Sequence, residues 1–473
     1  MKRLNGYDAM LLYSETPAVH THTMKIAVVD IGPSGLSFVR FRQLIEERLP
    51  LLEPLRYRLI DIPWKLHHPM WLENCAVDLD YHLRRVQLSG DGGRRRLDEV
   101  IAQIASTPLD RSRPLWEFHF VEGLDGNRIA VVGKVHHSLA DGVASANLMA
   151  RAMDLRPGQA QPEVTADRIP KSRELITAAA RDYVITIRQV PGVLGCTCRG
   201  VAKVARRSRQ RIRHPAIASK LSAPDTFITH VISPRRAFAS ATLSLDDVKE
   251  VGKALGITIN TLVLAVAAGA LRELLLRYDG HADVPIIASV PSSLNASADR
   301  LAGNELGGML VALPVQVEDT LERTRLTGHA VDDAKENYRL LGPELSARWM
   351  EFLPPALAPA AFARMARRKS KFRLFNVPIS NVPGPRRMGR FGDLTVRELY
   401  SVGPLTAGCG LNITVWSYVD QLNISVLADD QTVPDPHEVT DALVRSFSAI
   451  RAADRTDRTS KKPTGVSGPM TPG

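Results

Sequence analysis

The chain has 473 residues, of which 44% are hydrophobic and 23% charged, a balance typical of a folded chain able to bury two domain cores. Its 61 lysines and arginines exceed its 50 acidic residues, giving a formal charge of +11, which favours anionic partners such as lipid headgroups, CoA phosphates or nucleic acid. Its 4 cysteines are too few and too scattered for a disulfide framework, so we expect a reducing compartment.

The first predicted elements are a strand over 20–30, which carries His22, and an amphipathic helix over 38–47. Residues 1–8 lack the apolar core and the small-residue cleavage site of a signal peptide. We therefore expect a cytoplasmic protein. The histidines at 67, 68 and 82 are expected to have packing or surface roles.

A β-branched run over 129–135 predicts a buried strand that ends at His136 and His137. Residues 143–153 have the alanine, leucine and methionine content of a helix, and Asp141-Gly142 is a predicted turn between them. Successive side chains of a strand point to opposite faces. Only one of the two histidines is therefore expected to reach a reacting centre.

A histidine in this position suits general-base chemistry, because the unperturbed pKa of imidazole lies near neutral pH. The residues alone leave a second interpretation open: two hydrogen-bonded core histidines followed by an ordinary capping residue, Asp141. A metal site formed by His136, His137 and Asp141 is less favoured, because adjacent strand residues diverge and no third strong ligand lies nearby. We predict no metal.

Residues 155–172 are rich in proline and glycine, which predicts that an N-terminal domain, 1–155, closes there. We expect a connector over 156–225 with a helix over 174–190 and a stretch over 199–213 that holds seven basic and no acidic residues. This basic stretch is either a solvated helix face or flexible connector, or a surface that meets anionic lipid. Nucleic acid fits less well, because no binding module or aromatic platform accompanies the charge.

A second domain is expected over 226–450, followed by a disordered tail over 451–473. Ser244 is predicted to cap a helix that ends at Gly256. The apolar run that begins at residue 262 predicts a long buried helix, because flanking polar residues interrupt the span of ~20 apolar residues that a transmembrane helix needs. Any membrane contact is therefore expected to be peripheral.

The segment 349–375 places apolar residues before a basic cluster, and its three prolines prevent one continuous helix. It either meets a membrane interface or packs against the other domain, and both interpretations stay open. Motifs of other chemistries are missing from the sequence. It has no G-x-S-x-G nucleophile elbow, so Ser138 is not expected to act as a nucleophile. Nor is there a P-loop, a dinucleotide fingerprint, an H-E-x-x-H motif or a paired zinc spacing around Cys196 and Cys198.

Three blocks of the sequence together resemble one family. The block HHSLADG at 136–142 matches the HHxxxDG signature of CoA-dependent acyltransferases. PLDRSRPLWE at 108–117 and SNVPGP at 380–385 resemble blocks of the bacterial wax ester synthase/diacylglycerol acyltransferase family. Two positions depart from the pattern: Thr261 stands where the family usually has aspartate, and Asn295 where it more often has arginine.

The resemblance implies an α/β fold of two chloramphenicol-acetyltransferase-like domains in pseudo-symmetric contact, with a substrate channel between them. It further implies an acyl-CoA-dependent O-acyltransferase that esterifies diacylglycerol, or a long-chain alcohol to give a wax ester. Acyl-CoA would be a substrate, and no cofactor is expected. The expected contacts are peripheral, with the inner face of an anionic membrane or with a lipid droplet, and not with nucleic acid.

In that resemblance His137 is the general base, Asp141 holds the loop, Gly142 permits the turn and His136 is a structural neighbour. Ser380 or Asn381 is a candidate donor to the oxyanion of the tetrahedral intermediate, although the SNVPGP block alternatively only shapes a turn. Two other functions stay open: a condensation-type enzyme that takes its acyl group from a carrier protein, and a non-catalytic lipid-binding protein of the same fold.

Overall fold

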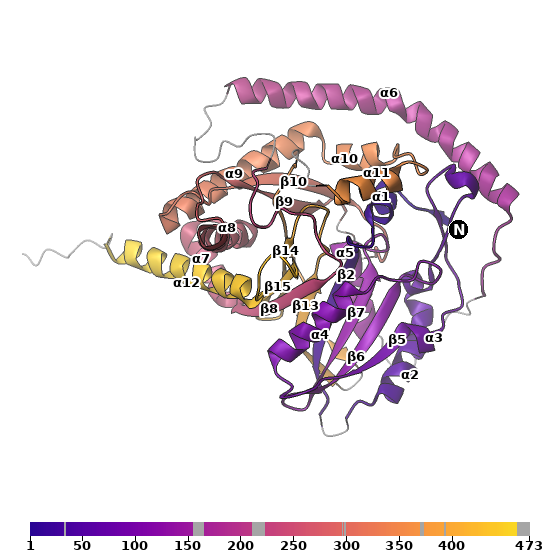
Figure 1. Ribbon diagram of the computed structural model, residues 1–473, viewed down its shortest axis with the longest axis horizontal. Coiled ribbons are helices and arrows are strands. Elements are labelled where there is room, and N and C mark those ends of the chain that lie inside the picture. The colour runs from indigo at the N-terminus through magenta and orange to yellow at the C-terminus, as the bar shows by residue number, and fades with distance from the viewer. Residues whose placement is uncertain are drawn as a thin grey trace, which may run out of the picture.

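The computed structural model describes residues 1–32, 35–154, 165–210, 223–295, 297, 299–368, 373–391 and 394–460. Its centre is a pair of six-stranded mixed sheets, in the orders β12-β13-β2-β7-β6-β5 and β10-β9-β11-β14-β15-β8, with a small sheet β1-β4-β3 beside them (Figure 1). The strands are β1 (Lys2–Arg3), β2 (His22–Asp30), β3 (Arg58–Ile60), β4 (Met70–Leu72), β5 (Leu83–Gln87), β6 (Trp116–Leu124), β7 (Arg128–His136), β8 (Arg236–Ser244), β9 (Ile286–Ser293), β10 (Leu306–Leu313), β11 (Val377–Val382), β12 (Arg390–Phe391), β13 (Leu394–Val402), β14 (Leu411–Tyr418) and β15 (Gln421–Asp429).

Helices cover both sheets. They are α1 (Gly6–Ser14), α2 (Phe38–Arg48), α3 (Leu79–His82), α4 (Arg94–Ser106), α5 (Gly142–Asp154), α6 (Ser172–Gln210), α7 (Leu245–Leu255), α8 (Ile259–Tyr278), α9 (Thr320–Leu341), α10 (Leu345–Met350), α11 (Ala358–Ala366) and α12 (His437–Ser460), with short 3-10 turns at Leu49–Leu51, Glu53–Arg56 and Pro63–Lys65. The expected α/β fold with two sheet-centred halves is confirmed.

Local sequence signals placed several elements correctly. The Ser244 hydroxyl accepts a hydrogen bond from the backbone N–H of Asp247 at the start of α7, and Gly256 ends that helix with a φ of 65°. The strand predicted before the paired histidines is β7, and the helix predicted after them is α5. These signals lie within a few residues of the element they specify, so the sequence suffices to find them.

The C-terminal half contributes β12 and β13 to the first sheet, which the domain boundaries did not anticipate. Strand β13 comes from the C-terminal half but pairs with β2 of the first sheet, with Ser401 opposite Lys25. Trp416 and Tyr418 of β14 are likewise buried in the apolar core of the N-terminal half. The expected domain 226–450 is therefore not self-contained, because a crossover strand has no local pattern that names its partner sheet.

The long apolar helix is α8, and it fills the core of the C-terminal half. Its side chains pack with those of β9, β11, β14, β15 and α12 in one apolar cluster. Among the described residues it is the one helix long and apolar enough to cross a bilayer, yet 67% of that window is buried inside the protein. Its burial explains the apolar run as core packing.

The connector holds a longer helix than expected. Helix α6 continues through Pro191 to Gln210 and lies along the outside of the molecule above α10 and α11 (Figure 1). The basic stretch is helical up to residue 210, and the rest of it lies outside the described residues, as does most of the predicted linker between the first domain and α6.

The expected tail from residue 451 is partly wrong. Helix α12 runs on to Ser460, because Arg451 forms an ion pair with Asp247 at 2.8 Å and Asp454 is buried. These contacts anchor the extra turns to α7 and the core. Residues 461–473, the rest of the predicted tail, lie outside the described residues.

Candidate active site

The paired histidines stand where β7 ends and the chain turns toward α5. His136 is the last residue of β7 and lies opposite His22 of β2. The backbone N–H of His137 still donates to Thr21 of the neighbouring strand at 2.8 Å, so the rings diverge to opposite faces of the sheet, as the alternation of a strand requires. The strand geometry thus gives the two rings different surroundings.

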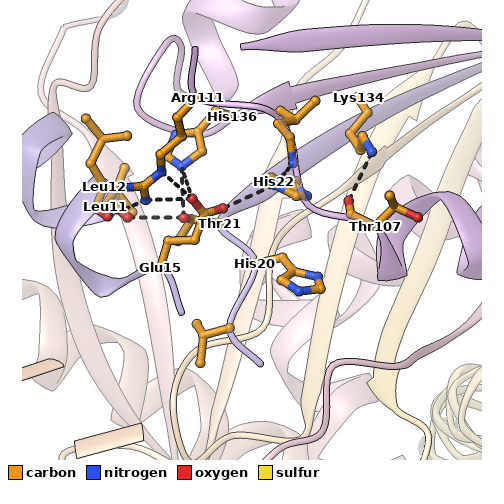
Figure 2. Close-up of polar contacts among 12 residues, drawn as sticks. Leu11, Leu12, Glu15, His20, Thr21, His22, Thr107, Arg111, Lys134 and His136 are labelled. Carbon is orange, nitrogen blue, oxygen red and sulfur yellow. Dashed lines mark hydrogen bonds and ion pairs between the residues drawn. The ribbon is translucent and has the colours of Figure 1, made fainter. Parts of the chain in front are cut away.

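His136 is fully buried, and both of its ring nitrogens have partners; Figure 2 shows the ring beside Thr21. The backbone N–H of Ser138 donates to Nδ1 at 3.1 Å, and Nε2 contacts the Thr21 hydroxyl at 3.0 Å. A backbone N–H can only donate, so Nδ1 carries no proton and Nε2 donates to Thr21. With both nitrogens in hydrogen bonds, this buried ring has no free position for substrate.

Glu15 holds this buried network together (Figure 2). Its carboxylate lies 2.6 Å from Arg111, 3.2 Å from His22 and 3.6 Å from His136. Burial alone would raise the pKa of Glu15, but the contacts with His136, His22 and Arg111 hold it well below its usual value. The network fixes the end of β7 and the loop that follows.

His137 is half-buried and faces the other side of the sheet. Its Nδ1 is buried with no hydrogen-bond partner in another described residue. Burial lowers the pKa of His137, and the nearby His136 and, to a smaller extent, Lys25 add to this, while its own backbone carbonyl and Asp141 oppose it. The ring is therefore neutral at physiological pH and able to accept a proton.

The loop after His137 is clamped to the C-terminal half of the chain. Ala140 bridges Gly303 in parallel fashion, with Gly303 N–H donating to the Leu139 carbonyl at 2.7 Å and Asp141 N–H to the Gly303 carbonyl at 3.2 Å. The shape of the histidine motif therefore depends on contacts with the segment that follows β9.

Asp141 is buried and forms an ion pair. Arg300 Nη2 lies 2.8 Å from its carboxylate, the backbone N–H of Glu305 donates to Oδ2 at 3.1 Å, and Ala144 N–H of α5 donates to Oδ1 at 3.0 Å. Asp141 thus caps α5 and joins the two halves. The expected loop-holding role of Asp141 has a geometric basis in these contacts.

Asn304 reaches the backbone of the histidine itself. Its side-chain amide donates to the His137 carbonyl at 2.7 Å and to Asp8 of α1 at 2.7 Å. Burial raises the pKa of Asp8 to about 8, although the hydrogen bonds from Asn304 pull in the other direction. Three distant segments, α1, the loop before β10 and the histidine motif, therefore meet at one amide.

Gly142 and the SNVPGP block lie against each other. A Cβ added to Gly142 would stand 3.2 Å from a methyl group of Val382, so the absence of a side chain permits this close approach. Ser380 Oγ bonds Thr414 Oγ1 at 3.2 Å on the face that carries Val382. Asn381 alternates to the opposite face of β11, so Ser380 is the better placed candidate donor.

The two departures from the family pattern have local explanations. Thr258 caps α8 by accepting a hydrogen bond from the backbone N–H of Thr261, and the two threonine hydroxyls lie 3.0 Å apart, so Thr261 joins the cap where the family usually has aspartate. Asn295 gives its backbone carbonyl to Arg300 Nη2 at 3.2 Å. The positive charge that pairs with Asp141 thus comes from Arg300, five residues after Asn295.

Sequence reasoning gave no role to four residues of the site: Asp8, Lys25, Arg300 and Asn304. Each lies more than a hundred residues from the histidines and becomes relevant only through tertiary contact. The buried position of charged side chains is the signal that marks them in the structure. Among the described residues no group of three or more His, Cys, Asp or Glu side chains is arranged to hold a metal ion.

Comparison with known proteins gives concordant results. The wax ester synthase/diacylglycerol acyltransferase catalytic domain matches residues 4–263, and the C-terminal domain of the same family matches residues 302–451. A protein of Mycobacterium tuberculosis strain H37Rv with the provisional name diacylglycerol O-acyltransferase is 53% identical over 455 residues, covering 96% of each chain. A second protein of that strain, similarly named, is 35% identical over 98% of this chain and 99% of its own.

Two solved structures share the fold. The wax ester synthase/diacylglycerol acyltransferase from Marinobacter aquaeolei VT8 superposes with a TM-score of 0.68 at 26% identity, covering 96% of this chain and 100% of that chain. The first condensation domain of the calcium-dependent antibiotic synthetase superposes with a TM-score of 0.61 at 17% identity, covering 96% of each. At that identity the second likeness describes the fold only.

Proposed function

The chain belongs to the wax ester synthase/diacylglycerol acyltransferase family, and we propose that it transfers an acyl group from acyl-CoA to diacylglycerol or a long-chain alcohol, with His137 as general base. Its membership of this family makes it an O-acyltransferase. The single observation that supports the assignment of the base is the contrast between the two histidines: His136 is saturated with hydrogen bonds, whereas His137 is neutral and half-buried.

The reaction follows from the position of that ring. His137 takes the proton of the acceptor hydroxyl as its oxygen attacks the thioester carbonyl, and a carbon–oxygen bond forms. The carbon–sulfur bond then breaks, and the imidazolium returns the proton to the departing CoA thiolate. A well-placed base contributes about 10²–10⁴ in rate.

The surrounding contacts hold the base in place. Asn304 fixes the His137 carbonyl at 2.7 Å, and Asp141 fixes the following loop through Arg300 at 2.8 Å. Asp141 and Asn304 are therefore positioning residues. Ser380 is proposed as one donor to the oxyanion, because its hydroxyl stands on the same face of β11 as Val382, which touches Gly142. This role requires the hydroxyl to turn away from Thr414 Oγ1, to which it donates at 3.2 Å.

A lipid acceptor requires contact with a lipid surface, and we place that contact on α6. Tyr183, Ile187, Leu194 and Val201 recur at intervals of four and seven residues, and each is about half exposed, at 47–55%. Residues so spaced share one face of a helix. The same helix exposes Arg181, Arg188, Arg199, Lys203 and Arg206, whose attraction to anionic headgroups is worth about 1 kcal/mol each.

The part of the 349–375 segment that is described adds to this surface. Leu357 and Met365 are 66% and 59% exposed, while the Trp349 indole N–H donates to Thr197 of α6 at 3.0 Å. The segment thus packs on α6 and still exposes apolar groups. We propose peripheral association with an anionic membrane or a lipid droplet on its cytoplasmic side, and no nucleic-acid partner.

The test of the enzymatic function uses purified protein, palmitoyl-CoA and either dioleoylglycerol or hexadecanol. Free thiol and ester product are followed together, so that ester synthesis is separated from thioester hydrolysis. We expect ester from at least one acceptor above a His137→Ala control. Equal product in both proteins contradicts the assignment, and ligand retention without thiol release indicates a lipid-binding protein instead.

The membrane contact is tested by flotation with vesicles that contain 30% anionic lipid. Replacing Arg181, Arg188 and Arg199 by glutamate is expected to reduce the floated fraction, because all three side chains are exposed on α6. The matched control replaces Arg84, Arg235 and Arg339, three exposed arginines outside α6. An equal effect of both triple variants contradicts the proposed surface.

A further inference from the structure

A buried lysine lies on the same face of the first sheet as His137. Lys25 of β2 stands opposite Gly133 of β7, and Thr23 stands opposite Val135. Because side chains alternate along a strand, Lys25, Thr23 and the residues at 133, 135 and 137 share one face. The positions of Lys25 and His137 differ by four residues, about 13 Å of strand at ~3.3 Å per residue.

Lys25 has no anionic partner among the described residues. It is 9% exposed, and its ammonium contacts the Ser401 hydroxyl and lies 4.3 Å from the centre of the Trp416 ring. Burial lowers the pKa of Lys25 to about 7, against the attraction of Asp141. Burying a cation without a neighbouring carboxylate costs several kcal/mol. A bound anion would therefore stabilise the buried ammonium of Lys25.

Its neighbours also offer unused hydrogen-bond donors. The indole nitrogen of Trp416 is buried and has no partner among the described residues. Ser401 accepts from Lys25, which leaves its own proton free for another acceptor. The ammonium lies over the face of the ring, whereas the indole N–H points outward in the ring plane toward Gly384. The ammonium and the Ser401 hydroxyl are therefore the two donors that meet at one place with no anionic acceptor among the described residues.

This place is connected directly to the catalytic motif. Trp416 of β14 pairs with Val382 of β11, and Val382 contacts Gly142. Lys25 is also near enough to His137 to lower the pKa of the imidazole. Its counterpart Lys134, one residue along β7 from the position opposite Lys25, faces the other side of the sheet and is paired with Glu117 at 2.9 Å.

We propose that Lys25 binds an anionic group of the acyl acceptor, a carboxylate or a phosphate carried a short distance from the hydroxyl that His137 deprotonates. The acceptors thus include hydroxylated lipids with a negative charge, in addition to neutral alcohols. This inference rests on the proposed acyl transfer and specifies its acceptor class. The chemistry of the step is unchanged: the hydroxyl oxygen forms the ester bond, and CoA leaves as the thiol.

The experiment compares acceptors that differ only in charge. One set is 3-, 6- and 10-hydroxyhexadecanoate against the methyl ester of each, which probes a carboxylate at three distances from the hydroxyl. The other is 1-palmitoyl lysophosphatidate against 1-palmitoylglycerol, which probes a phosphate. Thiol release and ester mass are measured with palmitoyl-CoA for the wild type, Lys25→Met, Lys25→Arg and His137→Ala.

The readout is the ratio of kcat/KM for each charged acceptor to that of its neutral counterpart, because this ratio cancels any loss common to both. We expect a ratio of at least 10 for one pair in the wild type, a fall of about tenfold in Lys25→Met through KM, and recovery to within about threefold in Lys25→Arg. Methionine fills a similar volume without charge, so the fold is expected to be retained.

Binding supplies a second readout that does not depend on turnover. In the His137→Ala background, the dissociation constant of the preferred charged acceptor is expected to rise about tenfold on adding Lys25→Met. An equal ratio in the wild type and Lys25→Met overturns this inference while ester formation from neutral acceptors upholds the proposed function. No ester from any acceptor above His137→Ala overturns both.

Discussion

Arg300 reaches across the two halves of the chain to place its guanidinium 2.8 Å from the carboxylate of Asp141, a residue 159 positions earlier. Both side chains are buried, with 9% and 0% of their surface exposed. The same guanidinium donates to the Gly303 carbonyl at 2.9 Å. The last residues of the histidine motif are therefore shaped by the segment between β9 and β10.

Removing Arg300 is expected to be costly, because Asp141 would remain as a buried carboxylate without its cation. Arg300→Met is predicted to lower the free energy of unfolding by about 3–5 kcal/mol and to reduce kcat by more than it raises KM. Urea denaturation and the thiol-release assay measure the two effects.

The matched control is Arg348→Ala, since Arg348 and Glu344 form an exposed pair with 52% and 63% of their side chains accessible. Its effect on stability should stay within about 0.5 kcal/mol. The double variant Asp141→Asn, Arg300→Met is expected to recover part of the stability lost in Arg300→Met. If Arg300→Met proves as mild as the control, the pair has no structural role.

Substitutions of the two histidines are predicted to differ in their effect on stability. His136→Ala leaves the Ser138 N–H and Thr21 hydroxyl without their partner, so the free energy of unfolding should fall by about 2–4 kcal/mol. His137→Ala removes no hydrogen bond to another described residue and should change stability by less than about 1 kcal/mol. Thermal denaturation of the two variants side by side checks this, and a reversed order would contradict the assignment.

The sequence was sufficient wherever the signal is local. The β-branched run before His136 gave β7, and Ser244 with Gly256 gave both ends of α7. The motif residues His137, Asp141 and Gly142 were identified because their spacing is fixed within seven positions. In each of these cases the determining residues are neighbours in the chain.

The rest depends on contacts that no local pattern encodes. The pairing of β13 with β2, the ion pair of Arg300 with Asp141 and the amide of Asn304 on His137 all join segments far apart in sequence. The tail was misjudged for a related reason: its polar composition hides the pairing of Arg451 with Asp247. Pro191 similarly did not end α6, since the helix is packed on both sides of it, Tyr183 against His67 before it and Thr197 against Trp349 of α10 after it.

Asp8 is predicted to make stability depend on pH. Burial raises its folded-state pKa to about 8, above the ordinary value in the unfolded chain. A raised pKa contributes stability at low pH that is lost as the pH rises from the unfolded pKa through about 8. Asp8→Asn keeps the acceptor for Asn304 but cannot ionise, so it should gain on the wild type by at least 1 kcal/mol between pH 5 and pH 8.5. Unfolding curves that stay parallel across this range would contradict the raised pKa.

The pH profile of kcat/KM is predicted to fall on its acid side only below the ordinary pKa of histidine. Burial lowers the pKa of His137, so the base stays neutral, and kcat/KM for hexadecanol should remain near its maximum at pH 6.5. Lys25→Met removes a nearby positive charge and should shift the midpoint of this limb to higher pH. A limb that lies above pH 6.5 in the wild type would contradict the lowered pKa.

The role of His137 is tested most directly by the rate of ester formation from palmitoyl-CoA and the preferred acceptor in the wild type and in His137→Ala, each shown by circular dichroism to be folded. The account predicts a fall in kcat of about 10²–10⁴ with little change in the thermal midpoint. A folded His137→Ala protein that forms ester within threefold of the wild-type rate would contradict it.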